Sequence, residues 1–357
     1  MKIHRIILKN VRNFVDFDYT FEDGWTGKIP EALLLIGPNG SGKTTILDTI
    51  AELWQLFFYF LQETEPVKVP KGILALPGIV IAIGITGIDD QSTWILYRGK
   101  DTPKLSGFPQ IHPSHRIYAS QTYAHGPTLS IKYAAPEETD FSSSPTTKQL
   151  EWQQRWSTML TENMLGKLQN LSNIVYFQSD SRQLLPVEEK FSIQPEPEEY
   201  RWLARYEPTI SRKGSLQNYL YNLKVVDETT FQQIVDEANE FVTGKQLNGF
   251  DRRTGDLMVK MENGNEHSIN DLSSGEKQVL LMLATITRWL RPGGIVLIDE
   301  PDLHLHPTLT TAFVSHLRRM IKEKGGQLII ASHATELWQD FTESHRVELG
   351  RLGEMAA

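Results

Sequence analysis

The segment 37–44 constrains this chain of 357 residues more than any other feature. It reads GPNGSGKT and fits the spacing G-x-x-x-x-G-K-[ST], between an apolar run at 32–36 and an expected helix at 44–60. In such a loop, successive backbone N–H groups point into one concavity, and the helix N-terminus adds partial positive charge. We therefore expect a triphosphate site, with ATP and Mg²⁺ as cofactors. Its expected residues are Gly37, Pro38, Asn39, Gly40, Ser41, Gly42, Lys43, Thr44 and Thr45.

Two of these side chains have distinct expected roles. Lys43 would reach the β- and γ-phosphates, and the hydroxyl of Thr44 would coordinate Mg²⁺. A second segment, 295–300, reads IVLIDE and predicts a buried strand that ends in two acids. Asp299 would hold Mg²⁺ through water, while Glu300 would orient or deprotonate the water that attacks the phosphate. This strand with its acids is common by itself, but together with the loop it indicates an ATPase.

The segment 271–278 reads DLSSGEKQ and opens a helix expected over 274–290. Ser273 is a candidate N-cap, and Glu276 lies three residues further on, as in a capping box. A well-capped helix is one interpretation of this segment. A second phosphate-binding helix end is the other, and the residues of the segment alone do not separate the two.

Composition limits the remaining possibilities. The chain has 36 basic and 44 acidic residues, so its net charge is −8 and a nucleic-acid site would need a local basic patch. The absence of cysteine excludes disulfides, thiolate zinc sites and cysteine nucleophiles. The first ten residues lack the long apolar core of a secretory signal, and the apolar stretch 72–88 is shorter than a membrane span. We expect a cytoplasmic protein that does not enter a membrane.

The chain alternates helix-like and strand-like segments, which predicts an α/β fold. We expect strands at 3–8 and 14–21, antiparallel strands over 79–133, and helices at 148–169, 215–223, 229–242 and 307–324. The acidic, proline-rich stretch 180–208 is expected to be an exposed loop. The expected organisation is a single head over 1–357. Its parts are an N-terminal lobe at 1–134, an insert with a helical subdomain at 135–270, and a C-terminal part at 271–357.

Four segments in this order, GPNGSGKTT, LSSGEKQ, LIDEPDLHLHP and IIASH, resemble the motifs of ABC-type ATPases. The turn NVRNF at 10–14, the run EPDLHLHP and the signature SSGEKQ resemble the SMC/RecF/OLD-like branch, which includes AAA family ATPases of anti-phage defence systems. The resemblance covers 1–48 and 270–335. It implies an ABC-type core with a mixed central sheet, an antiparallel β subdomain and a helical subdomain that carries the signature.

The resemblance also implies roles for residues outside the loop. Arg12 would help to hold the nucleotide, Asp302 would lie at a dimer seam, and His333 would act as a switch on the γ-phosphate. Gln178 resembles the Q-loop glutamine that ligates Mg²⁺ and water, with Gln183 as the competing candidate. Within the signature, Ser273, Ser274 and Gly275 would contact the γ-phosphate of ATP bound by a second subunit.

A homodimer or higher homo-oligomer that forms with ATP is therefore implied. Since only 24 residues follow His333, we expect a regulated effector, such as a nuclease, to be a separate chain. The apolar stretch 53–61 has two interpretations, a core helix or a surface that a partner covers. A RecF-like repair ATPase that binds DNA is the alternative function, and a transporter subunit is a third. His304 and His306 could suggest a metal site, but packing beside Pro307 is the interpretation we favour.

Overall fold

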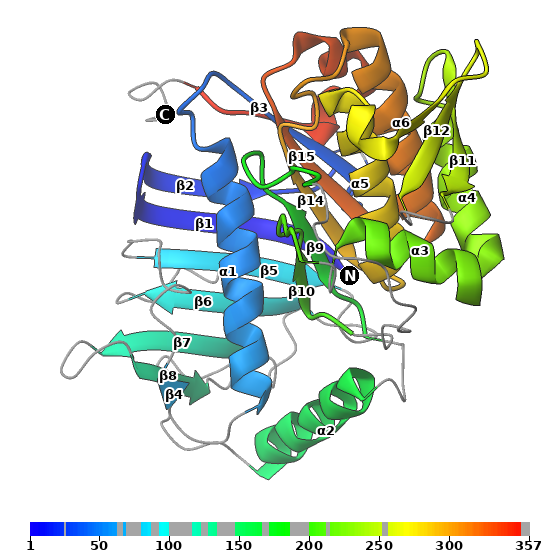
Figure 1. The fold of residues 1–357 in the computed structure, drawn as a ribbon. Coiled ribbons are helices and arrows are strands. Elements are labelled where there is room, and N and C mark those ends of the chain that lie inside the picture. Colours follow the sequence, from blue (N-terminus) through cyan, green and yellow to red (C-terminus); the bar gives the residue numbers. More distant parts are fainter. Residues whose placement is uncertain are drawn as a thin grey trace.

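The structure is a computed structural model that describes residues 1–24, 26–62, 67–68, 80–86, 93–99, 116–122, 128–133, 147–165, 171–185, 200–211, 215–251 and 256–350. Two large sheets, with helix α1 (Lys43–Gln62) between them, make up its framework (Figure 1). A group of helices covers the other face of one of these sheets. The predicted α/β class is confirmed.

The central sheet has the strand order β10-β9-β14-β15-β3-β16, and all its pairs are parallel. The strands β3, β14 and β15 are buried along their whole length, which is why they read as continuous apolar runs. Their carboxyl ends lie at one edge, where a parallel sheet places a ligand site. The bounds are β3 (Ala32–Ile36), β9 (Ile174–Phe177), β10 (Leu203–Arg205), β14 (Ile295–Asp299), β15 (Gln327–Ser332) and β16 (Arg346–Glu348).

The second sheet has the order β2-β1-β5-β6-β7-β8-β4, and only β6 and β7 pair in parallel. The antiparallel β subdomain is therefore confirmed. The resemblance implies a mixed central sheet, but the pairs of that sheet are all parallel, and antiparallel pairing occurs in the second sheet. Four of these strands, β5 to β8, come from the alternating part of the sequence at 79–133. The bounds are β1 (Lys2–Val11), β2 (Phe14–Thr20), β4 (Val67–Lys68), β5 (Val80–Thr86), β6 (Thr93–Gly99), β7 (Arg116–Thr122) and β8 (Thr128–Tyr133).

Helix α1 is buried inside the chain, which confirms the core interpretation of its apolar stretch. Leu53, Trp54, Leu56, Phe57 and Leu61 are each at most 3% exposed. The rings of Trp54 and Trp202 stack 4.1 Å apart, and each indole N–H donates to the other residue's carbonyl at 2.8 Å. Both sheets and the segment at Trp202 bury most of this stretch, while Phe58 and Tyr59 are half-buried, so the interpretation of the stretch as a partner surface stays a prediction.

The helical subdomain packs on the face of the central sheet opposite α1. It contains α3 (Leu216–Val226), α4 (Glu228–Asn239), α5 (Ser274–Trp289) and α6 (Pro307–Glu323), together with a small sheet of β11 (Lys245–Phe250), β12 (Leu257–Met261) and β13 (Glu266–Ser268). Helix α2 (Thr147–Met164) ends before the predicted limit of 169, and 166–170 lie outside the described residues. In the predicted loop 180–208, residues 203–205 form β10, while 186–199 also lie outside the described part.

Candidate nucleotide-binding site

The loop between β3 and α1 is held in place by the turn between β1 and β2. Asn13 donates from its side-chain amide to the carbonyl of Gly40. Gly42 has φ +101°, and a Cβ on it would lie 2.5 Å from the ring of Phe14. Only glycine therefore fits at this position, because both the backbone conformation and the close aromatic ring exclude a side chain. The segment NVRNF thus acts as a support for the loop.

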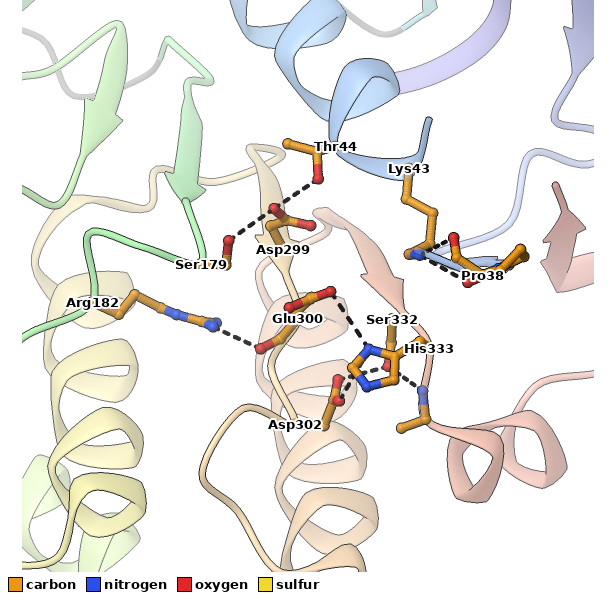
Figure 2. Close-up of polar contacts among 12 residues, drawn as sticks. Pro38, Lys43, Thr44, Ser179, Arg182, Asp299, Glu300, Asp302, Ser332 and His333 are labelled. Carbon is orange, nitrogen blue, oxygen red and sulfur yellow. Dashed lines mark hydrogen bonds and ion pairs between the residues drawn. The ribbon is translucent and has the colours of Figure 1, made fainter. Parts of the chain in front are cut away.

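Lys43 lies at the start of α1 and is only 5% exposed. Its Nζ donates to the carbonyls of Gly37 at 2.8 Å and Pro38 at 3.1 Å (Figure 2). Burial lowers the pKa of the ammonium group, whereas the carboxylates of Glu300, Asp299 and Asp302 act in the opposite direction. The ammonium group is thus held over the loop where phosphates would be cradled.

A hydroxyl and a carboxylate meet at the end of β14. Thr44 donates to Oδ2 of Asp299 at 2.9 Å, and the hydroxyl of Ser179 donates to the same atom at 3.3 Å. The other oxygen, Oδ1, is buried and has no hydrogen-bond partner within the described ranges. Burial is also the main cause that raises the pKa of Asp299. A hydroxyl and a carboxylate oxygen with a free lone pair are ligands that suit Mg²⁺, which keeps several waters and phosphate oxygens.

Gln178 directly follows Phe177, which pairs with Ile298 in the register of β9 and β14. It is half-buried and lies one residue from Ser179, at the same sheet edge as Asp299. Gln183 is exposed, and its backbone carbonyl accepts a hydrogen bond from Tyr206 at 3.0 Å. The geometry favours Gln178 over Gln183, and its role as a metal ligand stays a prediction.

Glu300 turns the chain sharply at the end of β14. Its backbone has φ +51°, in the left-handed region that a glutamate rarely adopts. Its carboxylate lies 3.5 Å from Nδ1 of His333, and the carboxylate of Asp302 lies 3.9 Å from the same nitrogen. Ser332 donates to Asp302 at 2.6 Å and accepts from the N–H of Ala334 at 2.9 Å, which ties this turn to the end of β15 (Figure 2).

Arg12 lies at the first turns of α1 rather than inside the loop. Its guanidinium donates to Thr45 at 3.3 Å and to Asp48 at 3.2 Å. Asp48 also accepts from the hydroxyl of Tyr176 at 2.9 Å. The arginine side chain is 41% exposed, so it lies beside the loop where it can turn toward a bound nucleotide. Its role in holding the nucleotide stays a prediction.

The signature segment begins α5 and forms the capping box that its spacing predicts. Ser273 accepts from the N–H of Glu276 at 3.3 Å, and its own N–H donates to the Glu276 carboxylate at 2.8 Å. Lys245 also contacts that carboxylate at 2.8 Å. Ser273 and Ser274 are exposed, whereas Gly275 is buried against the turn at His304. The two serines are thus available to a second subunit, and Gly275 connects the signature to the turn after β14.

Gly275→Ala should destabilise the chain by about 2 kcal/mol, because the new methyl group is overpacked. A Cβ at this position would lie 2.6 Å from the carbonyl oxygen of His304. Within a helix, alanine is otherwise favoured over glycine by about 1 kcal/mol. Any loss of stability in this variant is therefore caused by the close contact of the new methyl group. Urea unfolding measures the change. Gly24→Ala, with open space around its Cβ, is the control. An increase in stability of Gly275→Ala would contradict the close contact.

Several functional candidates were not predicted from the sequence. Ser179, Arg182 and Ser332 each contact one of the acidic residues at 299–302. Ser179 and Arg182 belong to none of the recognised motifs, and Ser332 lies within IIASH without an expected role. His304 and His306 are both exposed. No cluster of three or more His, Asp or Glu side chains suited to a metal occurs in the described part of the chain.

Comparison with known proteins relates the chain to ATPases. The model of the family described as "AAA domain, putative AbiEii toxin, Type IV TA system" matches residues 33–337. The retron Vc95 probable ATPase of Vibrio cholerae serotype O1 biovar El Tor is 24% identical, over 92% of this chain and 71% of that protein. The retron Ec83 probable ATPase of Escherichia coli is 30% identical over 38% of this chain, and that match spans only 28% of the relative.

Solved structures also resemble the chain at low sequence identity. The SMC head domain from Thermotoga maritima aligns over 95% of this chain and 92% of its own, with a TM-score of 0.42 and 12% identity. The cbiO1 subunit from Clostridium perfringens, part of the ABC transporter complex cbiONQ, aligns over 93% and 79%, with a TM-score of 0.32 and 16% identity. None of the helices described here is long and apolar enough to cross a bilayer.

Proposed function

The chain belongs to the family described as "AAA domain, putative AbiEii toxin, Type IV TA system", and we propose that it hydrolyses ATP with Mg²⁺. One observation carries this proposal: the side chains of Lys43, Thr44, Asp299, Glu300 and His333 converge at the carboxyl ends of β3, β14 and β15. Thr44 and Asp299, for example, are 255 positions apart along the chain, yet their side chains meet at one edge of the sheet.

The proposed roles follow from the contacts. Lys43 would exchange its two carbonyl partners for phosphate oxygens, and its charge would stabilise the charge that develops during phosphoryl transfer. Thr44 and Asp299, with Gln178 beside them, would hold Mg²⁺, which when bound neutralises charge on the phosphates. Glu300 would accept a proton from the attacking water. His333, close to Glu300 and half-exposed, would contact the terminal phosphate.

We further propose that two copies of the chain complete each site. Ser273 and Ser274 are exposed at the N-terminus of α5, where backbone N–H groups and the helix dipole favour a phosphate. Asp302, near His333, would lie at the seam between the copies. Because the γ-phosphate would be contacted from both sides, its loss on hydrolysis would loosen the dimer.

The proposed biological role is that of a sensor ATPase that controls a separately encoded effector in a defence system. The similarity to probable ATPases of two retrons supports this role. We propose that the effector docks on the helices and the insert, although most of α1 itself is buried within the chain.

Phosphate release from ATP, with Mg²⁺ and with excess EDTA, tests the enzymatic part of the proposal. We expect release only with Mg²⁺. Co-expression with the neighbouring gene product, followed by affinity purification, tests the regulatory part. A chain that hydrolyses ATP but acts in cells without a co-purifying protein would leave the ATPase assignment intact and contradict the sensor role.

A further inference from the structure

A buried arginine contacts the predicted catalytic turn from a segment without any motif. Arg182 lies in the turn after β9 and is 3% exposed. One of its Nη atoms donates to the backbone carbonyl of Glu300 at 2.6 Å (Figure 2). Its Nε and other Nη are buried without hydrogen-bond partners in the ranges that the structure describes. A guanidinium is rarely buried in this way without a specific reason.

The contact is made to a strained residue. Glu300 has φ +51°, a conformation that costs free energy in a residue with a side chain. Its N–H donates to Ala331 at 2.7 Å, while its carbonyl accepts from Arg182 and from the N–H of Leu303 at 3.2 Å. The peptide groups on both sides of Glu300 are therefore fixed, and its carboxylate turns toward His333.

Charge gives the arginine a second effect. Three carboxylates, those of Asp299, Glu300 and Asp302, lie within four positions and repel one another. Burial lowers the pKa of Arg182 to about 10, while these three acids act in the opposite direction. The group remains protonated at neutral pH, so its positive charge offsets part of the repulsion.

We propose that Arg182 is a positioning residue for ATP hydrolysis, which holds the backbone of Glu300 so that the carboxylate is aligned with the attacking water. This inference rests on the proposed ATPase function. Lysine at this position would keep the charge but lose the planar fork and part of its reach, so it would replace arginine only in part.

The test compares Arg182→Met and Arg182→Lys with the parent chain in steady-state ATP hydrolysis. We expect kcat of Arg182→Met to fall about 100-fold, because a small misplacement of a reacting group has an effect of this size. The KM for ATP should stay within about threefold, since phosphate contacts are retained. Arg182→Lys should have an intermediate kcat. Arg318→Met is a matched control, because Arg318 also donates to a backbone carbonyl, that of Asp340, at 2.6 Å.

Arg318→Met should lower the melting temperature but leave kcat and KM unchanged. A parent-like kcat in Arg182→Met would overturn the inference. A loss of activity that is fully explained by a smaller folded fraction of the variant would overturn it as well. If Arg182→Met does not fold, Arg182→Lys decides, and a parent-like kcat in that variant overturns the inference. A parent chain no more active than Lys43→Ala would instead contradict the proposed function, and the positioning role would fall with it.

Discussion

Lys43→Ala is expected to lower kcat/KM for ATP by about 1000-fold, a loss typical of removing a major stabilising group from a charged transition state. Lys43 is the buried cation of the loop, and its Nζ lies against the carbonyls of Gly37 and Pro38. The fold should persist, because the hydrogen bonds of the ammonium group in the described part of the chain are all to this loop. Phosphate release and binding of a fluorescent nucleotide measure the effect, and circular dichroism confirms folding.

A matched control separates this effect from a general loss of charge. Lys260 is an exposed lysine on β12, remote in the fold from the loop, and Lys260→Ala should behave like the parent. If Lys43→Ala hydrolyses ATP at the rate of the parent, the loop is not the nucleotide site. If both variants lose activity equally, the loss does not report on this site.

Glu300→Gln is expected to bind ATP but to hydrolyse it about 1000-fold more slowly, because the amide cannot accept the proton of the attacking water. The substitution keeps the shape of the side chain and the backbone contacts of Glu300 to Ala331 and Arg182. Since the γ-phosphate would persist, the dimer should also persist in ATP and Mg²⁺. Sedimentation velocity with and without ATP measures the dimer, and phosphate release measures turnover.

The control for this variant is Glu262→Gln, an exposed glutamate after β12. It should hydrolyse ATP normally and dissociate after turnover. Normal hydrolysis by Glu300→Gln would contradict the role of Glu300 as the base. If Glu300→Gln loses turnover but stays monomeric with ATP, the role of Glu300 as the base would stand and the proposed dimer would be contradicted.

The sequence predicts those parts of the site that local chemistry dictates. The glycines of the loop, the cap at Ser273 and the buried strand before Asp299 each follow from a few adjacent residues, and all are present in the structure. Arg182 and Ser332 act through contacts that cross the chain, over 118 and 30 positions respectively. Neither contact leaves a local pattern, so only the arrangement of β9, β14 and β15 reveals them.

The same distinction applies to the fold. The long apolar strands and the helices around the loop are predictable because their periodicity is strong. The strands β10 and β16 have three residues each and depend on parallel partners, β9 and β3, for their hydrogen bonds. Strand β11 contains Asn248 and Gly249, which weaken its strand pattern. These elements form because neighbours are already in place, which a single stretch of sequence does not encode.

If each ATP site is built from two copies of the chain, as proposed, mixing two inactive variants should restore activity. Lys43→Ala removes the loop's cation, and Ser274→Arg places a bulky cation at the exposed start of α5. Each variant alone should be inactive. In an equal mixture, half of the dimers pair the two variants, and each of these has one intact site, so about a quarter of the parent activity should return. A mixture that stays as inactive as its components would contradict the shared site.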